Sequence, residues 1–267
     1  MKTLLAFALA ATAGTAVAQP TFLATQGSTL LRYTEGSGSV DSFALSNPII
    51  GLTTNPDGQI IGSSPGSEPT PGFYSLDDPF GTPSLSFLGA SGDARGYTSL
   101  TYAGDELYGF FDGGQQLFNI DDSSFTGSSL GFIGVNNVTF GGSAYDESTD
   151  TFFAMGYDLS SFEVFVYEVE DFSTNPQGTL IGNTGVLGDG MSLEFFDGVL
   201  YAAIQNRDTG AFELGTIDTS TGAFTFEQVL ADSFSPSGDP TSLVIIPTPG
   251  TFAALGLGGL IAARRRR

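Results

Sequence analysis

Short runs of hydrophobic residues alternate along the chain with clusters of Gly, Asp, Ser and Thr. No stretch keeps the 3.6-residue hydrophobic period of an amphipathic helix. Short apolar runs that are bounded by turn residues are typical of β-strands. One junction, Phe196-Asp197-Gly198-Val199, has the Asp-Gly pair favoured in a two-residue type I′ hairpin. The pattern therefore predicts an all-β fold.

A group of four such runs is repeated along the chain. The clearest copy covers residues 99–134, and further copies start near residues 51, 143 and 192. The residues that align the first strands are separated by 48, 44, 49 and 50 positions, and they are Gly51, Ser99, Ser143, Ser192 and Ser242. Repeats of this length are typical of folds built from small antiparallel units.

The last copy is incomplete, because no strands follow the run at Thr241–Ile246 before the C-terminal segment. Three predicted strands within residues 21–45 lack a first strand, so the two ends of the body can complete one unit together. The sequence thus predicts a five-bladed β-propeller over residues 19–246, closed by pairing of its N- and C-terminal strands. A β-sandwich is the alternative all-β fold. The turns at 121–127 and 218–222 resemble those of many secreted bacterial propellers.

Residues 1–18 have the pattern of a secretory signal peptide. One lysine precedes a short apolar run, and the small residues Ala16 and Ala18 mark a cleavage site before Gln19. A membrane-spanning helix is the alternative, but it needs about 20 apolar residues and this run is shorter. The chain is therefore expected to be exported by the secretion machinery.

The C-terminal segment has three parts. The first is Pro247-Thr248-Pro249-Gly250, the second is an apolar stretch over 251–263, and the third is the basic cluster of Arg264, Arg265, Arg266 and Arg267. The apolar stretch predicts one short transmembrane helix, and the arginines fit a cytoplasmic flank. A plain single-span anchor would have the same layout.

This three-part segment, together with an export signal, resembles the PEP-CTERM sorting signal of bacteria. Thr248 stands where that family has Glu, and Gly250 stands where it usually has Ser. The resemblance implies an exosortase-type enzyme as partner, which would cut near the motif and release the body or transfer it to the cell surface. It further implies transient inner-membrane anchoring at residues 247–267 and a final place at the surface or in an extracellular polysaccharide matrix.

The predicted body is strongly acidic. It holds 29 Asp and Glu residues against three arginines, Arg32, Arg95 and Arg207, which gives a net charge of −26. A nucleic-acid-binding surface needs a basic footprint, so nucleic acid is not expected as a partner.

The residue inventory limits the chemistry that the body can perform. The chain contains no His, Cys or Trp, and its lysine lies in the predicted signal peptide. Catalytic triads, cysteine nucleophiles and typical zinc sites are therefore excluded. No enzyme activity and no cofactor are predicted, and the body is expected to be a structural or binding module.

Carboxylate chemistry remains open in two forms. A glycoside hydrolase needs two carboxyl groups, and the candidates are Asp112, Asp158, Asp189, Glu194 and Asp208. A calcium-stabilised adhesin needs clustered oxygen ligands, and the calcium candidates are Asp121, Asp122, Asp146, Glu147 and Asp150. Hairpin turns use the same residue types, so a purely structural role is the alternative for these five.

Overall fold

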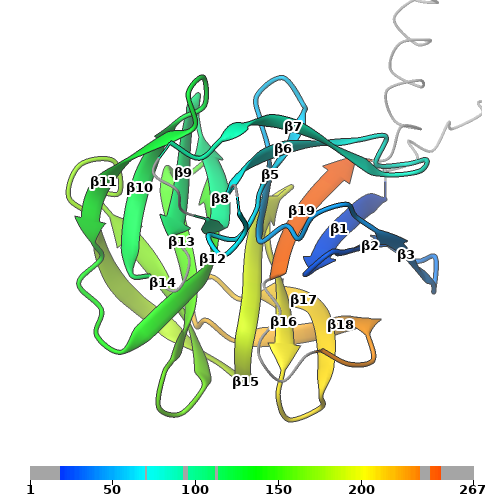
Figure 1. The fold of residues 1–267 in the computed structure, drawn as a ribbon. Coiled ribbons are helices and arrows are strands. Elements are labelled where there is room, and N and C mark those ends of the chain that lie inside the picture. Colours follow the sequence, from blue (N-terminus) through cyan, green and yellow to red (C-terminus); the bar gives the residue numbers. More distant parts are fainter. Residues whose placement is uncertain (1–18, 70, 93–95, 112–113, 235–240, 248–267) are drawn as a thin grey trace, which may run out of the picture.

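The computed structural model of the protein describes residues 19–69, 71–92, 96–111, 114–234 and 241–247. These residues form nineteen antiparallel β-strands and no helix, which confirms the all-β prediction. The strands make four separate sheets (Figure 1).

The first sheet joins the two ends of the described chain in the order β19-β1-β2-β3. Its strands are β1 (Pro20–Gln26), β2 (Thr29–Thr34), β3 (Val40–Ala44) and β19 (Thr241–Pro247). β1 and β19 pair over their whole length, from Pro20 opposite Pro247 to Gln26 opposite Thr241.

Two further sheets are four-stranded meanders in sequence order. One contains β4 (Gly51–Thr54), β5 (Ile60–Ser63), β6 (Gly72–Asp77) and β7 (Ser84–Ala90). The other contains β8 (Tyr97–Ala103), β9 (Glu106–Phe111), β10 (Gln116–Asp121) and β11 (Thr126–Phe132).

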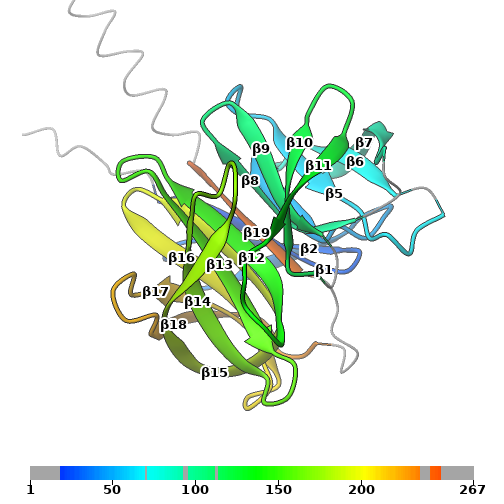
Figure 2. The same cartoon turned by 90° about the vertical axis from the view of Figure 1, so that its left-hand side faces the viewer.

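The fourth sheet has seven strands in sequence order. They are β12 (Val138–Asp146), β13 (Thr151–Asp158), β14 (Glu163–Glu170), β15 (Gln177–Phe196), β16 (Val199–Asn206), β17 (Ala211–Ile217) and β18 (Phe224–Ala231). Figures 1 and 2 show this sheet beside the β8–β11 sheet on one side and beside β19 on the other.

The prediction of a five-bladed β-propeller is wrong. The described strands form four sheets instead of five, and none of them is closed into a propeller or a barrel. The physical reason lies in β15, which continues for 20 residues. Its first half pairs with β14 and its second half with β16, so two predicted units become one sheet.

The predicted short transmembrane helix has no counterpart in the described part of the chain. No helix there is long and apolar enough to span a membrane. Residues 251–263, to which the prediction referred, lie outside the described residues.

The Asp-Gly hairpin prediction is confirmed. Asp197 and Gly198 connect β15 to β16 as a two-residue loop, with φ angles of 49° and 81°. Positive φ at both positions is what a type I′ turn requires, and this turn matches the twist of the paired strands. The local sequence therefore fixes the register from Phe196 opposite Val199 onward.

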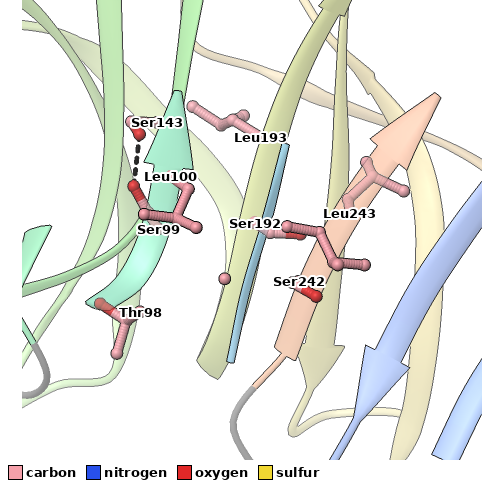
Figure 3. A pocket seen from close by; sticks show the side chains of 10 residues that line it. Thr98, Ser99, Leu100, Ser143, Ser192, Leu193, Ser242 and Leu243 are labelled. Atoms are coloured by element: carbon pink, nitrogen blue, oxygen red, sulfur yellow. Dashed lines mark hydrogen bonds between the residues drawn. The ribbon is translucent and has the colours of Figure 1, made fainter. Parts of the chain in front are cut away.

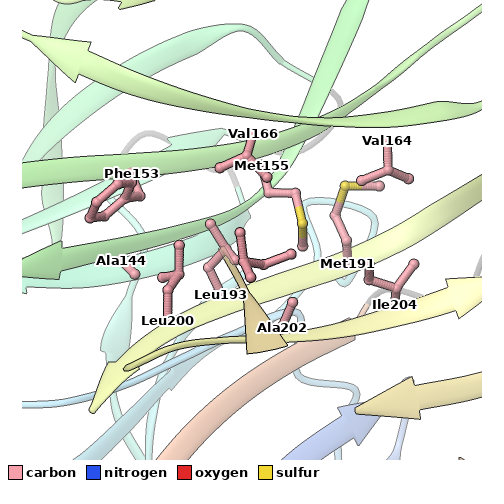
Figure 4. Packing of buried hydrophobic residues seen from close by; sticks show 11 residues of the cluster. Ala144, Phe153, Met155, Val164, Val166, Met191, Leu193, Leu200, Ala202 and Ile204 are labelled. Atoms are coloured by element: carbon pink, nitrogen blue, oxygen red, sulfur yellow. The ribbon is translucent and has the colours of Figure 1, made fainter. Parts of the chain in front are cut away.

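Five clusters of buried hydrophobic residues hold the sheets together. One lies inside the bend of the seven-stranded sheet, where Met155 and Val166 face Met191 and Leu193 (Figure 4). Another joins β19 and β1 to the β4–β7 sheet through residues such as Leu23 and Val244. Because no cysteine is present, this apolar packing is the main source of stability.

The strands β4, β8, β12, β15 and β19 contact one another at the middle of the molecule. Small residues allow some of these close approaches. A Cβ added to Gly51 would lie 2.6 Å from the carbonyl oxygen of Tyr97, and one added to Gly142 would lie 2.8 Å from the backbone nitrogen of Leu193. Glycine at both positions therefore lets strands of the same or adjacent sheets touch through their backbones.

Candidate functional site

The five residues that align the sequence repeats lie together in the structure. Gly51, Ser99, Ser143, Ser192 and Ser242 line one small cavity where the middle strands meet (Figure 3). Its volume is about 10 Å³. This is at the lower limit of the space for one water molecule, so the cavity is too small for an organic ligand.

Hydrogen bonding is uneven around this central cavity. Ser143 Oγ bonds to the hydroxyl of Ser99 and, at 2.6 Å, to that of Thr101. Ser242 Oγ lies 2.5 Å from Thr25 Oγ1. Ser192 Oγ is buried and has no hydrogen-bond partner among the described residues. Ser99, Ser143 and Ser242 thus form hydrogen bonds to a neighbouring strand, whereas the Ser192 hydroxyl forms none with the described residues.

This difference predicts unequal effects of the same substitution. Ser143→Ala should lower the free energy of unfolding by about 1–2 kcal/mol, because it leaves two buried hydroxyls with a lost partner. Ser192→Ala should change it by less than about 0.5 kcal/mol, since its hydroxyl bonds to no group in the described ranges. Urea unfolding of the two variants measures both values. Equal losses would contradict the hydrogen-bond pattern.

A larger cavity opens at the turns that follow β4, β8 and β12. Its volume is about 300 Å³, and we refer to it as the tyrosine cavity. Its lining consists of Thr54, Asn55, Pro56, Tyr102, Gly104, Asp105, Tyr145 and Glu147. A cavity of this size is at the lower end of the range for small-molecule sites.

Both tyrosines of this cavity donate a hydrogen bond to an aspartate. The hydroxyl of Tyr102 donates to Asp122 at 3.2 Å, and that of Tyr145 donates to Asp150 at 2.6 Å. Burial, together with Asp122, raises the pKa of Tyr102. The hydrogen bond to Asp150 is the main cause that raises the pKa of Tyr145 to about 12. Both phenols therefore remain protonated donors at neutral pH.

The lining of the tyrosine cavity contains acidic residues and no basic one. In the described part of the chain, Arg32 and Arg207 are held elsewhere. Arg32 pairs with Asp41 at 2.8 Å, and Arg207 lies over the ring of Phe162, 3.7 Å from its centroid. The negative charge of Asp105 and Glu147 is consequently not neutralised by either arginine.

A second sequence pattern explains many of the other aspartates. The sequence Asp-x-Ser-Ser or Asp-x-Ser-Thr occurs five times, at Asp121, Asp146, Asp158, Asp171 and Asp218. Four of these turns share one side-chain hydrogen bond, and they begin at Asp121, Asp146, Asp158 and Asp218. In each, the aspartate side chain accepts the backbone N–H of the residue two positions later. This is the Asx-turn geometry that makes Asp favourable in turns.

Hydrogen bonds in these turns lower the pKa of Asp218, chiefly through the hydroxyl of Ser220. A lowered folded-state pKa stabilises the protein above the unfolded pKa, and the contribution is lost as pH falls through the folded value. Stability should therefore decline below about pH 4. In Asp218→Asn, which keeps an oxygen acceptor but does not titrate, thermal unfolding should show a weaker dependence on pH below that value. An unchanged pH dependence would contradict the role of this carboxylate.

The calcium candidates lie either in Asx turns or around the tyrosine cavity. Asp121 and Asp146 accept hydrogen bonds within their own turns, and Asp122 and Asp150 accept the tyrosine hydroxyls. Glu147 lines the tyrosine cavity. Within the described ranges, no three acidic side chains gather in a way that could hold a metal ion.

The glycosidase candidates have different surroundings. Asp158 accepts hydrogen bonds in its turn, Asp208 lies exposed in the turn after β16, and Asp112 is outside the described residues. Asp189 Oδ2 lies 3.6 Å from Arg207, and the other oxygen, Oδ1, is buried with no hydrogen-bond partner in the part of the chain that the structure describes. Burial raises the pKa of Asp189, and Arg207 opposes that shift.

Glu194 has the property expected of a general acid, because burial raises its pKa to about 8. Its side chain nevertheless keeps partial exposure. Asp189 is five positions away on the same strand, which corresponds to about 15 Å along an extended chain. Glycoside hydrolysis needs two carboxyl groups within about 5–9.5 Å, so this pair does not form such a site.

The processing residues flank the described body. Pro247 is the last residue of β19 and is exposed. The remaining motif residues Thr248, Pro249 and Gly250, the cluster Arg264–Arg267, and the cleavage-site residues Ala16 and Ala18 lie outside the described residues.

Comparison with known proteins gives only distant likenesses. No family model and no curated protein matches the chain. Among solved structures, a "putative 6-phosphogluconolactonase" from Bacteroides uniformis ATCC 8492 shares 14% identity at a TM-score of 0.40, over 80% of this chain and 68% of that one. An auxiliary nutrient binding protein from Bacteroides ovatus ATCC 8483 shares 11% identity at 0.49, over 81% and 58%. Likenesses this weak carry no argument about function.

The tyrosine cavity was not predicted from the sequence. A signal for it does exist, because Tyr102 follows the alignment residue Ser99 by three positions and Tyr145 follows Ser143 by two. A tyrosine at the end of two successive first strands places two phenols at the same end of neighbouring strands. Asp105 and Glu147 then follow in the adjoining turns.

Proposed function

We propose that the protein is an exported, non-catalytic binding or structural module of the bacterial surface or extracellular matrix. Its C-terminal segment is recognised and cut by an exosortase-type enzyme, and its N-terminal segment is removed during export. The body that remains is the described β-structure.

One observation carries this proposal. Pro20, the first residue of β1, lies opposite Pro247, the last residue of β19. The predicted signal cleavage falls just before Gln19, and the sorting motif starts at Pro247. Both cuts would therefore fall at the same end of one strand pair. Neither would remove a residue from the pairing of β1 with β19.

A binding role is favoured over catalysis by the state of the carboxylates. Those in the Asx turns are engaged in local hydrogen bonds, and Asp189 and Glu194 are too far apart for paired catalysis. We expect no glycoside hydrolysis by the purified protein. Turnover of a glycoside panel that disappears in both Asp189→Asn and Glu194→Gln would overturn the non-catalytic assignment.

The sorting part is tested by altering the motif in producing cells. Pro247→Ala combined with Pro249→Ala should leave unprocessed protein in the membrane fraction and reduce the amount recovered from the surface. Pro79→Ala, in a surface turn of the body, is the matched control and should behave like the unaltered chain. Equal surface recovery of the motif variant would contradict recognition of this segment.

A further inference from the structure

We propose that the tyrosine cavity binds an organic ammonium group, carried by an amino sugar or an aliphatic amine. This inference rests on the proposed binding role and names the ligand class for it. The proposal rests on a cavity of about 300 Å³ that combines two tyrosines with Asp105 and Glu147, two carboxylates that pair with neither described arginine.

The shape of the cavity suits a small ligand. Its lining comes from the ends of three middle strands and the turns that follow them: β4, β8 and β12. A volume of about 300 Å³ accommodates one sugar ring or a short amine but not a folded partner. The central serine cavity, at about 10 Å³, cannot hold either.

The charge of the cavity selects a cation. Asp105 and Glu147 are exposed at its lining, and Asp122 and Asp150 lie next to it as acceptors of the tyrosine hydroxyls. An anionic ligand would meet repulsion from all four carboxylates. A cation would gain from the same charges, and the gain should weaken as salt is added.

The tyrosines select an organic cation. Ammonium groups bind favourably to the faces of aromatic rings. Each phenol donates its proton toward a carboxylate, at 3.2 Å for Tyr102 and 2.6 Å for Tyr145. Such a bond polarises the donor and increases the electron density of the ring. The hydrogen bonds to Asp122 and Asp150 therefore strengthen the attraction of the tyrosine rings for a cation.

A calcium ion is a poorer occupant of the tyrosine cavity, and a second cavity is a poorer site for an amine. A calcium ion needs six to eight oxygen ligands converging on one point, and the described residues contain no such group of acidic side chains. A second cavity of about 300 Å³ lies beyond the β12–β13 turn, next to Asp146 and Glu168. Both carboxylate oxygens of Asp146 already accept bonds from Ser148 and Thr149, and no tyrosine lines that cavity.

The experiment is a calorimetric titration of the purified protein at low salt with glucosamine, putrescine and N-acetylglucosamine. Glucosamine and putrescine carry the ammonium group, and their relative affinities show whether a sugar or an aliphatic chain is the preferred carrier. N-acetylglucosamine keeps the sugar ring but has no positive charge, so it should bind at least about tenfold more weakly than glucosamine.

Substitutions test whether glucosamine binds in the tyrosine cavity. Glu147→Gln should weaken glucosamine binding by about fivefold, because it removes one partly screened charge from the cavity. Asp208→Asn, which removes an exposed carboxylate in the turn after β16, is the matched control and should leave the affinity unchanged. Tyr145→Phe tests the bond to Asp150 and should also weaken binding.

The inference is overturned if neither amine binds saturably, if N-acetylglucosamine binds as tightly as glucosamine, or if Glu147→Gln and Asp208→Asn give the same affinity. These failures concern the ligand alone. The sorting proposal fails by a different result, which is normal surface recovery of the Pro247→Ala, Pro249→Ala variant.

Discussion

A chain that ends after residue 240 is expected not to fold, whereas a chain that ends after Pro247 is expected to unfold cooperatively. The seven residues between these ends form β19, in which only Pro247 is exposed. Leu243 and Ile245 belong to one hydrophobic cluster, and Val244 and Ile246 belong to another. Loss of these four aliphatic side chains removes about 6–12 kcal/mol of burial free energy, comparable to the whole stability of a domain.

Circular dichroism and urea unfolding of the two truncated chains measure this difference. The chain that ends after Pro247 serves as the control, because it lacks the whole C-terminal segment beyond the motif's first residue yet retains β19. A cooperative transition of the shorter chain at the same urea midpoint would show that β19 is dispensable. It would then contradict the role assigned to the pairing of β1 with β19.

Phe140→Ala is expected to lower the free energy of unfolding by about 3–5 kcal/mol. The side chain is fully buried between the β8–β11 sheet and the seven-stranded sheet. Its ring stacks on Phe110 with centroids 5.0 Å apart and meets Tyr167 edge-on at 5.4 Å. Alanine would leave a cavity at this junction and break both aromatic contacts.

The matched control is Phe226→Ala on β18, where 52% of the residue surface is exposed. Its effect should stay within about 0.5 kcal/mol, as for most surface substitutions. Urea unfolding curves of both variants give the comparison. A loss of less than about 1 kcal/mol at Phe140, or equal losses at the two positions, would contradict the packing described here.

The strands and several turns of this protein can be predicted from local sequence, because they depend on neighbouring residues. The Asp197-Gly198 hairpin is one case, since its positive φ angles follow from the residue types. The alignment residues are another. Their spacing in the sequence predicts equivalent positions, and the structure brings all five to one cavity.

The number of sheets could not be predicted because it depends on a non-local choice at β15. Residues 182–190 contain four glycines and lie just before the predicted start of the unit near residue 192. In the structure this segment is part of β15, with a positive φ of 79° at Gly185 and irregular pairing near Val166 and near Gly188. No proline interrupts it, and β14 and β16 both offer edges to pair with. The strand therefore continues and joins the two units.

The candidate site was harder to predict than the fold. From the sequence, the acidic residues are candidates both for metal ligands and for catalytic pairs, because both chemistries use carboxylates. In the structure Asp150 accepts a bond from Tyr145, and Asp121 accepts bonds from Ser123 in its own turn. The donor to which each carboxylate bonds depends on how neighbouring strands are placed, and local sequence does not determine that placement.

We propose that the β-body bounded by the pair of β1 and β19 is the mature form at the cell surface. The most direct measurement is the intact mass of the protein recovered from the surface of producing cells, with both termini sequenced by fragmentation. We expect a chain that begins at Gln19 and ends within Pro247–Gly250. A surface form that still ends at Arg267, or that begins before Gln19, would contradict it.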